Sequence, residues 1–267
     1  MKATTLTVLI AAMPALLRAE PVPQSDLDRL PPAQILVLGE VHDNPQHHLN
    51  QARAIGAQRP AAVVWEMLTP EQAAAMPGDR TDAEALAVAL GWAESGWPDF
   101  ALYFPIFEAA GSARHYGAGI PRPEARRAFS EGAAAVFGPE AARFGLDAAL
   151  PTAEQTAREA AQFDAHCAAM PIGMMGGMVE AQRLRDASLA RAALLALDET
   201  GGPVAVIAGS GHARRDHGAP ALIAQAAPGV SVLALGQTES DPGPDAPYDL
   251  WVITEPVDRP DPCESLR

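Results

Sequence analysis

The sequence has almost no lysine, and this shortage limits the partners that the protein can bind. Lys2 is the only lysine in the 267 residues, and acidic residues outnumber basic ones, so the formal net charge is -14. Binding to the phosphate backbone of a nucleic acid depends on clustered lysine and arginine. We therefore expect no nucleic-acid partner.

Long apolar segments are also scarce. One apolar run, from Leu6 to Leu17, follows a single cationic residue and precedes the small residue Ala19. This is the pattern of a secretory signal peptide, so we expect residues 1–19 to be a signal peptide and the protein to be periplasmic. A bilayer-spanning helix needs about 20 apolar residues. No comparable run follows residue 19, so no transmembrane segment is expected in the mature chain.

Cysteine is limited to two residues, and several catalytic motifs are missing. Cys167 and Cys263 could pair in an oxidising compartment, but their spacing matches no motif, so pairing stays open. The sequence contains no Cys-x-x-Cys pair, no His-Glu-x-x-His helix and no Gly-x-Ser-x-Gly turn. The common zinc-protease and serine-hydrolase classes therefore gain no support from motifs.

Short apolar runs alternate with long stretches typical of helices. The runs are apolar at successive positions, which predicts strands of a sheet covered on both faces. They are Ile35 to Leu38, Ala61 to Trp65, Val204 to Ala208, Val230 to Leu235 and Leu250 to Ile253. The predicted helices are Gln46 to Ala57, Asp82 to Ala89, Ile106 to His115, Pro123 to Val136, Thr152 to Ala169 and Met174 to Leu197.

This alternation predicts an α/β fold, with a mostly parallel central sheet flanked by helices. A 48% hydrophobic content at this length is enough for one large core, so we expect a single domain over residues 20–255. Residues 256–267 are rich in proline and aspartate and predict a loop-forming tail.

Ionisable residues follow three of the predicted strands, where the ligands of parallel sheets usually bind. They are Glu40, His42, His47 and His48 after the first strand, Glu66 after the second, and His212 after Gly209-Ser210-Gly211. Imidazole and carboxylate groups can hold a metal or haem iron, or act as general bases. We expect these side chains to converge on one pocket.

Each of these residues also has an ordinary structural interpretation. Asn44 and Pro45 suit the N-cap and first position of a helix, so the histidines after them could simply be exposed at its start. Glu66 could cap a helix or pair with an arginine. Arg185 and Asp186 lie on one helix stretch and are typical of a salt-bridged surface. The residues alone leave these alternatives open.

Taken in order, the segments resemble the ChaN-like haem-binding uptake proteins, which are related to the Tiki, TraB and erythromycin esterase superfamily. The matching segments are Gly39-Glu40-Val41-His42-Asp43 with His47-His48, Trp65-Glu66-Met67, Phe107-Glu108-Ala109-Ala110, residues 181–187 with 189–190, and residues 208–212 with 218–220. The resemblance implies an α/β fold, haem binding and a role in haem or iron uptake. It also implies a possible homodimer, because haem is sometimes held between two subunits.

The resemblance also extends the set of residues expected to bind the cofactor. That set is Glu40, His42, His47, His48, Glu66, Arg185, Asp186 and His212. The resemblance implies that the iron is sometimes bound by tyrosine, but Tyr103, Tyr116 and Tyr248 all lie outside the matching segments. The axial ligand, one of these tyrosines or a histidine, therefore stays open.

An enzyme is the alternative that the wider superfamily suggests. Its hydrolases use the Glu and His of two Gly-x-x-His motifs, which here are Glu40, His42 and His212. In a metal-dependent esterase or peptidase, Glu40 would activate water, while His42 and His212 would bind a divalent metal. Arg185 would stabilise the developing negative charge. A binding module for some other anionic ligand is a third possibility.

Overall fold

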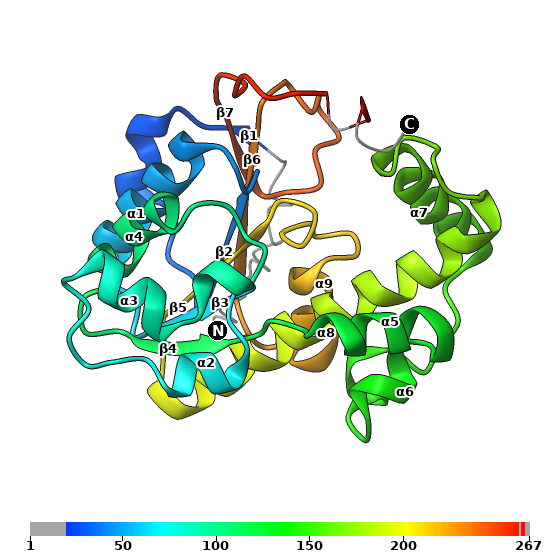
Figure 1. Ribbon diagram of the computed structural model, residues 1–267, viewed down its shortest axis with the longest axis horizontal. Helices are drawn as coiled ribbons and strands as arrows, with labels where there is room; N and C mark the ends of the chain where they lie inside the picture. The colour runs from blue at the N-terminus through cyan, green and yellow to red at the C-terminus, as the bar shows by residue number, and fades with distance from the viewer. Residues whose placement is uncertain (1–19, 262, 265–267) are drawn as a thin grey trace, which may run out of the picture.

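A parallel sheet forms the centre of the protein (Figure 1). The computed structural model describes residues 20–261, 263 and 264, so the expected signal peptide lies outside the described residues. Seven strands are ordered β1-β7-β6-β2-β5-β3-β4, and every neighbouring pair is parallel. They are β1 Glu20–Pro21, β2 Ile35–Glu40, β3 Ala62–Trp65, β4 Arg114–Gly117, β5 Val204–Gly209, β6 Val232–Thr238 and β7 Leu250–Ile253.

Helices cover both faces of this sheet, which confirms the α/β fold predicted from the sequence. The α-helices are α1 Pro45–Gln58, α2 Pro70–Ala74, α3 Ala83–Ala89, α4 Phe100–Ala110, α5 Arg122–Glu131, α6 Ala133–Phe137, α7 Thr152–Ala165, α8 Met175–Thr200 and α9 Ala219–Ala226. Short 3-10 helices are η1 Gln24–Arg29, η2 Trp92–Glu94, η3 Ala141–Phe144 and η4 Ile172–Met174. Within residues 20–261, no helix is both long and apolar enough to cross a membrane.

The pleat of the central strands divides the apolar side chains between two cores. In β2, Ile35 and Val37 belong to one core, whereas Leu36 and Leu38 belong to the other. Successive side chains of a strand point to opposite faces, so a run that is apolar throughout fills both cores. Helices α1, α3 and α4 close the second core, while α5, α6, α8 and α9 close the first.

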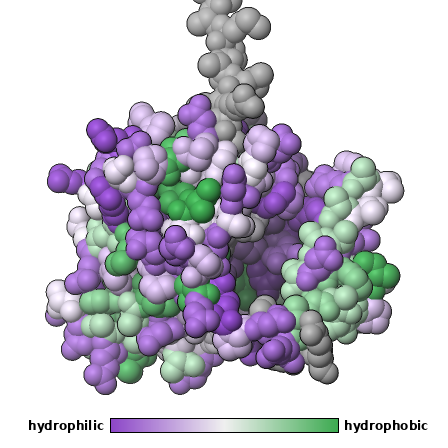
Figure 2. All heavy atoms as spheres, turned by 90° about the horizontal axis from the view of Figure 1, so that it is seen from above, coloured by the Kyte–Doolittle hydropathy of each residue, from purple (hydrophilic) through white to green (hydrophobic). Residues whose placement is uncertain are grey.

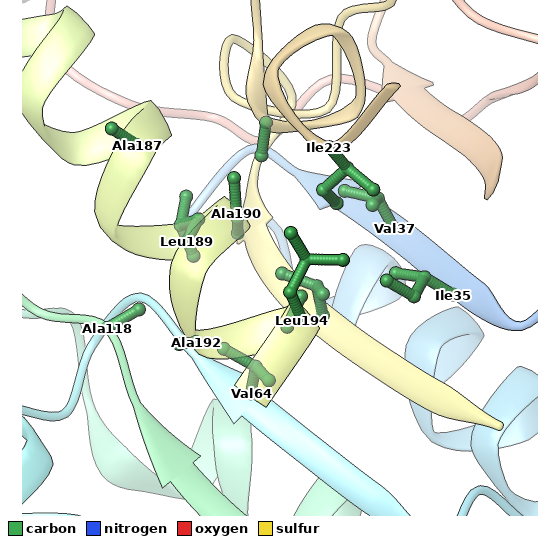
Figure 3. Packing of buried hydrophobic residues seen from close by; sticks show 14 of the residues in the cluster. Ile35, Val37, Val64, Ala118, Ala187, Leu189, Ala190, Ala192, Leu194 and Ile223 are labelled. Atoms are coloured by element: carbon green, nitrogen blue, oxygen red, sulfur yellow. The ribbon is translucent and has the colours of Figure 1, made fainter. Parts of the chain in front are cut away.

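Helix α8 approaches the first core through small side chains. Ala187 and Ala190 on this helix are fully buried and belong to the same core as Val37, Val64 and Ile223, some of whose side chains Figure 3 draws. Alanine has a high helix propensity and takes little space, so a long helix can lie close to the sheet along much of its length. This close packing places the N-terminal half of α8 near the strand ends.

Three predicted helices end or break earlier than expected: Thr152 to Ala169 ends at Ala165, and the other two end or break at glycine. The stretch Ile106 to His115 instead forms the end of α4, which stops before Gly111, a residue with a φ of 53°. The predicted helix Pro123 to Val136 is divided into α5 and α6 at Gly132, whose φ is 89°. A positive φ is easy for glycine and incompatible with continuing an α-helix.

The tail is fixed to the rest of the protein at two points. Within residues 256–261 it forms neither helix nor strand. Arg259 forms ion pairs with Asp43, at 2.8 Å, and with Glu239, at 2.6 Å. Cys263 forms a disulfide with Cys167, which follows α7. The cysteine pairing that the sequence left open therefore joins the tail to the end of α7.

Candidate functional site

The connections between strands reverse direction at β2 and β5, which are neighbours in the sheet. After β2 the chain passes through α1 to β3, on the far side of β5. After β5 it passes through α9 to β6, on the far side of β2. Because α1 and α9 contribute to different cores, they leave this point on opposite faces of the sheet. Such a reversal opens a crevice at the carboxyl ends of the strands, where ligands of parallel sheets usually bind.

Glu40 ends β2 at this crevice and holds His42. Its side chain is buried, and its Oε1 atom lies 2.7 Å from Nδ1 of His42. The hydroxyl of Tyr103 donates to the same oxygen at 3.0 Å. A carboxylate can only accept, so Nδ1 of His42 carries the proton and Nε2 of the neutral ring has a free lone pair. Carboxylates orient metal-binding histidines in this way.

Nε2 of His42 is the atom that this arrangement leaves available. It has no hydrogen bond to any described residue, and the His42 side chain is 34% exposed. Burial acts to lower the pKa of His42, but the hydrogen bond to Glu40 and the charge of Glu66 outweigh it, so the pKa is raised. A ligand that takes up this lone pair must therefore compete with a proton, and binding through Nε2 should be favoured at higher pH.

Glycine at position 209 lets His42 and Glu66 meet at the end of β5. A Cβ atom on Gly209 would lie 3.0 Å from Nε2 of His42 and 3.7 Å from Oε2 of Glu66. The backbone N–H of Gly209 also donates to Oε2 of Glu66 at 2.7 Å. A larger residue would push these side chains apart, so this glycine is part of the site.

Glu66 and Asp186 hold His212 between them. Nδ1 of His212 lies 2.6 Å from Oδ1 of Asp186 on α8, and Nε2 lies 3.3 Å from Oε1 of Glu66. Burial acts to lower the pKa of His212, but the two negative charges overcome it and raise the pKa to about 10. Burial acts to raise the pKa of Glu66, and the charge of His212 outweighs it to give a pKa of about 2. The group is therefore a buried imidazolium between two carboxylates.

His47 and His48 are fully buried, so neither is exposed at the helix start as the simpler interpretation required. Nδ1 of His47 accepts from the Val41 N–H at 2.8 Å, and its Nε2 lies 2.8 Å from the Thr254 hydroxyl. Burial lowers the pKa of His47 to about 4, so the ring is neutral. His48 donates from Nε2 to the His42 carbonyl at 2.9 Å. These two histidines shape the loop that carries His42.

None of the three tyrosines offers a free hydroxyl in this structure. Tyr103 is fully buried on Glu40, and burial followed by the charge of Glu40 raises its pKa far above the usual value. Tyr116 donates to Glu199, and burial raises its pKa to about 12. Tyr248 donates to the Ser210 carbonyl at 3.2 Å. A phenolate ligand would need one of these contacts to break.

Two cavities flank the Glu66–His212 pair. One has a volume of about 520 Å³ and lies between α7, α8 and the loop that contains His212. Figure 2 shows a hollow with hydrophilic walls between the body of the molecule and the part where α7 lies in Figure 1. The other, of about 530 Å³, is lined by Glu66, Trp97 and Arg185. Both volumes are in the range of small-molecule sites.

The remaining predicted site residue, Arg185, faces the second cavity. It is half-buried and, unlike its neighbour Asp186, makes no hydrogen bond or ion pair with any described residue. The structure therefore brings Glu40, His42, Glu66, Asp186 and His212 to one crevice and places Arg185 at its edge.

A metal held by both His42 and His212 has little support from the donor atoms. Both nitrogens of His212 face carboxylates, as described above. In the part of the chain that the structure describes, no three His, Cys, Asp or Glu side chains form a group that could hold a metal ion. A divalent metal shared by these two histidines would therefore need His212 to leave one of its carboxylates.

Three residues of the site were not singled out in the sequence. Trp97 lies edge-on to His42, with 4.8 Å between ring centroids. Arg158 of α7 approaches Asp186, with 3.9 Å between Nη2 and Oδ2. Arg122 begins α5 and lines the second cavity. In the sequence, only Trp97 could have been recognised as a candidate, because it is a tryptophan in a loop with glycine and proline. The two arginines lie in ordinary charged helices.

Comparison with known proteins agrees with this architecture. The family model described as "Haem-binding uptake, Tiki superfamily, ChaN" matches residues 27–223, which include all the predicted site residues. A solved structure described as "Cofacial heme binding to ChaN of Campylobacter jejuni" has a TM-score of 0.61 and 18% sequence identity, covering 84% of this chain and 88% of that chain. At 18% identity, this similarity shows that the two chains share a fold. No curated protein matches the sequence.

Proposed function

Because the chain belongs to the ChaN haem-binding uptake family of the Tiki superfamily, we propose that it binds haem at the β2–β5 crevice and takes part in haem or iron handling. The observation that carries the proposal is the free Nε2 of His42, held in place by a buried carboxylate. Imidazole is a common axial ligand of haem iron. Bound haem would supply the iron, and His42 would be its ligand from this chain.

The other residues of the crevice fit the same ligand. Haem joins an iron centre to a large apolar ring and two carboxylates. The second cavity has apolar walls from Trp97 and Leu189 and an unpaired cation, Arg185. Tyr103 and Glu40 fix the imidazole, while the imidazolium of His212 keeps Glu66 ionised and in place. Each part of the ligand therefore has a counterpart of suitable chemistry.

Titration of the purified protein with haemin tests this proposal. The Soret band should shift and then stop changing as haemin is added. The ratio of haemin to protein at which the change stops gives the stoichiometry of binding. An unrelated protein of similar size and net charge is the control for nonspecific uptake. If haemin binds to both proteins with equal affinity and gives no distinct Soret band, the proposal is wrong.

We also propose that the protein acts after export, in the periplasm. The pattern in residues 1–19 and the Cys167–Cys263 disulfide support this location, because disulfides persist in oxidising compartments. Fusion of residues 1–25 to alkaline phosphatase, which is active only after export, is the direct test. The fusion should be active, and N-terminal sequencing of the mature protein should find residue 20 as its first residue. An inactive fusion that still carries Met1 would overturn the proposal.

A haem-linked homodimer is a further part of the proposal. Ile172 and Met174 are exposed in η4, where α7 is joined to α8, and would supply apolar contact area. Light scattering with and without haemin should show the mass doubling on haemin addition. An unchanged mass at saturating haemin would show that the chain binds haem as a monomer.

A further inference from the structure

The second cavity contains two arginines from different elements. Arg122 is the first residue of α5, and Arg185 lies on α8. Both line the cavity of about 530 Å³ together with Trp97 and Leu189. The cavity therefore combines two cations with apolar walls.

Neither arginine has a partner among the described residues. Within the described residues, Arg122 and Arg185 make no hydrogen bond, ion pair or cation–π contact, although acidic residues outnumber basic ones in this chain. Arg183, two residues before Arg185, shows the usual contrast: it pairs with Glu180 and donates to the carbonyls of Gly145 and Ala148. Arg185 is half-buried, so its unpaired guanidinium carries a desolvation cost that an anionic ligand would offset, whereas Arg122 is exposed.

The backbone beside Trp97 makes room for one of these cations. A Cβ atom on Gly96 would lie 2.6 Å from Nη2 of Arg122. Residue 96 also has a φ of 81°, which glycine adopts easily. The guanidinium of Arg122 can therefore lie against the chain next to Trp97.

The acidic residues of the cavity leave both arginines free. Glu66 is engaged by His212 and by the N–H of Gly209. Glu94 is exposed at the edge. The cavity thus presents positive charge toward a ligand. The ring of Trp97, which lines this cavity, lies against that of His42, with 4.8 Å between centroids.

We propose that Arg122 and Arg185 bind the two propionate carboxylates of the ligand, with Trp97 and Leu189 contacting its apolar ring. This inference rests on the proposed haem function and deepens it by naming the groups that select a dicarboxylate. Arginine suits this role because its planar guanidinium forms two parallel hydrogen bonds with one carboxylate. The positions of the arginines then orient the porphyrin relative to His42.

The test compares haemin with haemin dimethyl ester, which keeps iron and ring but carries no carboxylate. Both are delivered from the same detergent micelles to wild-type protein and to the variants Arg122→Gln, Arg185→Gln and Arg126→Gln. Arg126 lies one turn beyond Arg122 on α5, is exposed and does not line the cavity, so it is the matched control.

We expect wild-type protein to prefer haemin over the ester by at least about 10-fold, since charge-assisted hydrogen bonds are the stronger class. Arg122→Gln and Arg185→Gln should each reduce that preference by weakening haemin binding, while binding of the ester stays unchanged. Arg126→Gln should behave as wild type. The preference should also fall as salt is raised.

Other outcomes separate this inference from the proposed function. If haemin and the ester bind equally to wild-type protein, or if both cavity variants keep the full preference, the arginine assignment is wrong and haem binding stands. If neither compound binds, both proposals fall. Thermal unfolding checks that each variant is folded, and Arg122→Gln, at an exposed helix start, carries the test if Arg185→Gln does not fold.

Discussion

The loops after β2 and β5 each carry a histidine whose Nδ1 is bonded to a carboxylate, but the two histidines differ at the second nitrogen. Nε2 of His42 has no partner and the side chain is 34% exposed. Nε2 of His212 faces a second carboxylate, Glu66, and the residue is buried. One histidine can therefore bind a ligand, whereas the other is locked in place.

The charge around each ring explains this difference. His212 lies between two carboxylates that hold it as an imidazolium, and an imidazolium has no lone pair for iron. His42 has one hydrogen-bonded carboxylate, Glu40, which orients the ring without occupying Nε2. A His–carboxylate pair at a strand end is thus a ligand site or a structural element according to what meets its second nitrogen.

The largest effect is expected from His212→Ala. This variant leaves Glu66 and Asp186 as buried carboxylates without their shared cation, so the free energy of unfolding should fall by about 3–5 kcal/mol. Denaturant unfolding measures it. His217→Ala is the control, because His217 pairs only with Asp216 at 3.2 Å at the surface and should change stability by less than about 1 kcal/mol. If the two variants lost equal stability, the buried His212 pairs would contribute no more to stability than the surface pair of His217.

A large effect of pH on stability should follow from His212 and His47. The folded pKa of His212 is raised to about 10, so its contribution is complete below pH 6.5 and is lost as pH rises toward 10. The folded pKa of His47 is lowered to about 4, so stability is lost as pH falls from 6.5 toward 4. Unfolding free energies measured across this range should therefore peak near pH 6.5. A His212→Asn variant should lose the alkaline decline but keep the acidic one.

His42→Ala tests the ligand side of the comparison. It removes the free Nε2, so haemin affinity should fall by about 100-fold, the upper end of the loss seen when a residue supporting a metal ligand is removed. Haemin titration followed in the Soret band measures this. The unfolding free energy should fall by about 1–3 kcal/mol, because the buried Glu40 carboxylate loses one hydrogen bond. His217→Ala should leave both quantities unchanged. Unaltered haemin binding by His42→Ala would show that another residue holds the iron.

Glu40→Gln should have a smaller effect on the same titration. The amide keeps the size of the side chain but removes the charge that raises the pKa of His42. Affinity for haemin should fall by about 10-fold, as expected for a residue that orients a ligand. The pKa of His42, followed by NMR, should drop. A variant that binds haemin as wild type would show that Glu40 only stabilises the fold.

The smallest effect is expected from Tyr103→Phe. The hydroxyl donates one hydrogen bond to Glu40, and its loss should lower stability by about 1 kcal/mol. The Soret band should stay where it is in wild type, because the buried hydroxyl is not an iron ligand in this structure. A displaced Soret band would show that Tyr103, and not His42, is the axial ligand of the iron.

The prediction of the fold from sequence succeeded where side-chain polarity matched the sheet. The five apolar runs became β2, β3, β5, β6 and β7, with small changes at their ends. Strand β4 was missed because its sequence, Arg114-His115-Tyr116-Gly117, is polar: it pairs only with β3 at the edge and is not buried on both faces. Strand β1 has two residues, too few for any pattern.

For the site, the sequence predicted which residues gather but not what each one does. Glu40, His42, Glu66 and His212 meet because each follows a strand, and parallel strands end at one edge. That His47 and His48 would be buried was not predictable, because His47 contacts Thr254, 207 residues along the chain, and the ring of His48 packs against that of Tyr103 in α4. Local patterns carry no information on such contacts.

The sequence by itself determined the α/β class, the parallel core and the strand-end location of the polar residues, because these depend on short-range hydrophobic patterning. Only the tertiary structure decided that β5 lies between β2 and β3, that Cys167 pairs with Cys263, and that His212 is enclosed by two carboxylates while His42 keeps a free nitrogen. The physical reason is distance along the chain: hydrogen bonds and charges act over a few ångströms in space, and folding alone brings Glu66, Asp186 and His212 within that range.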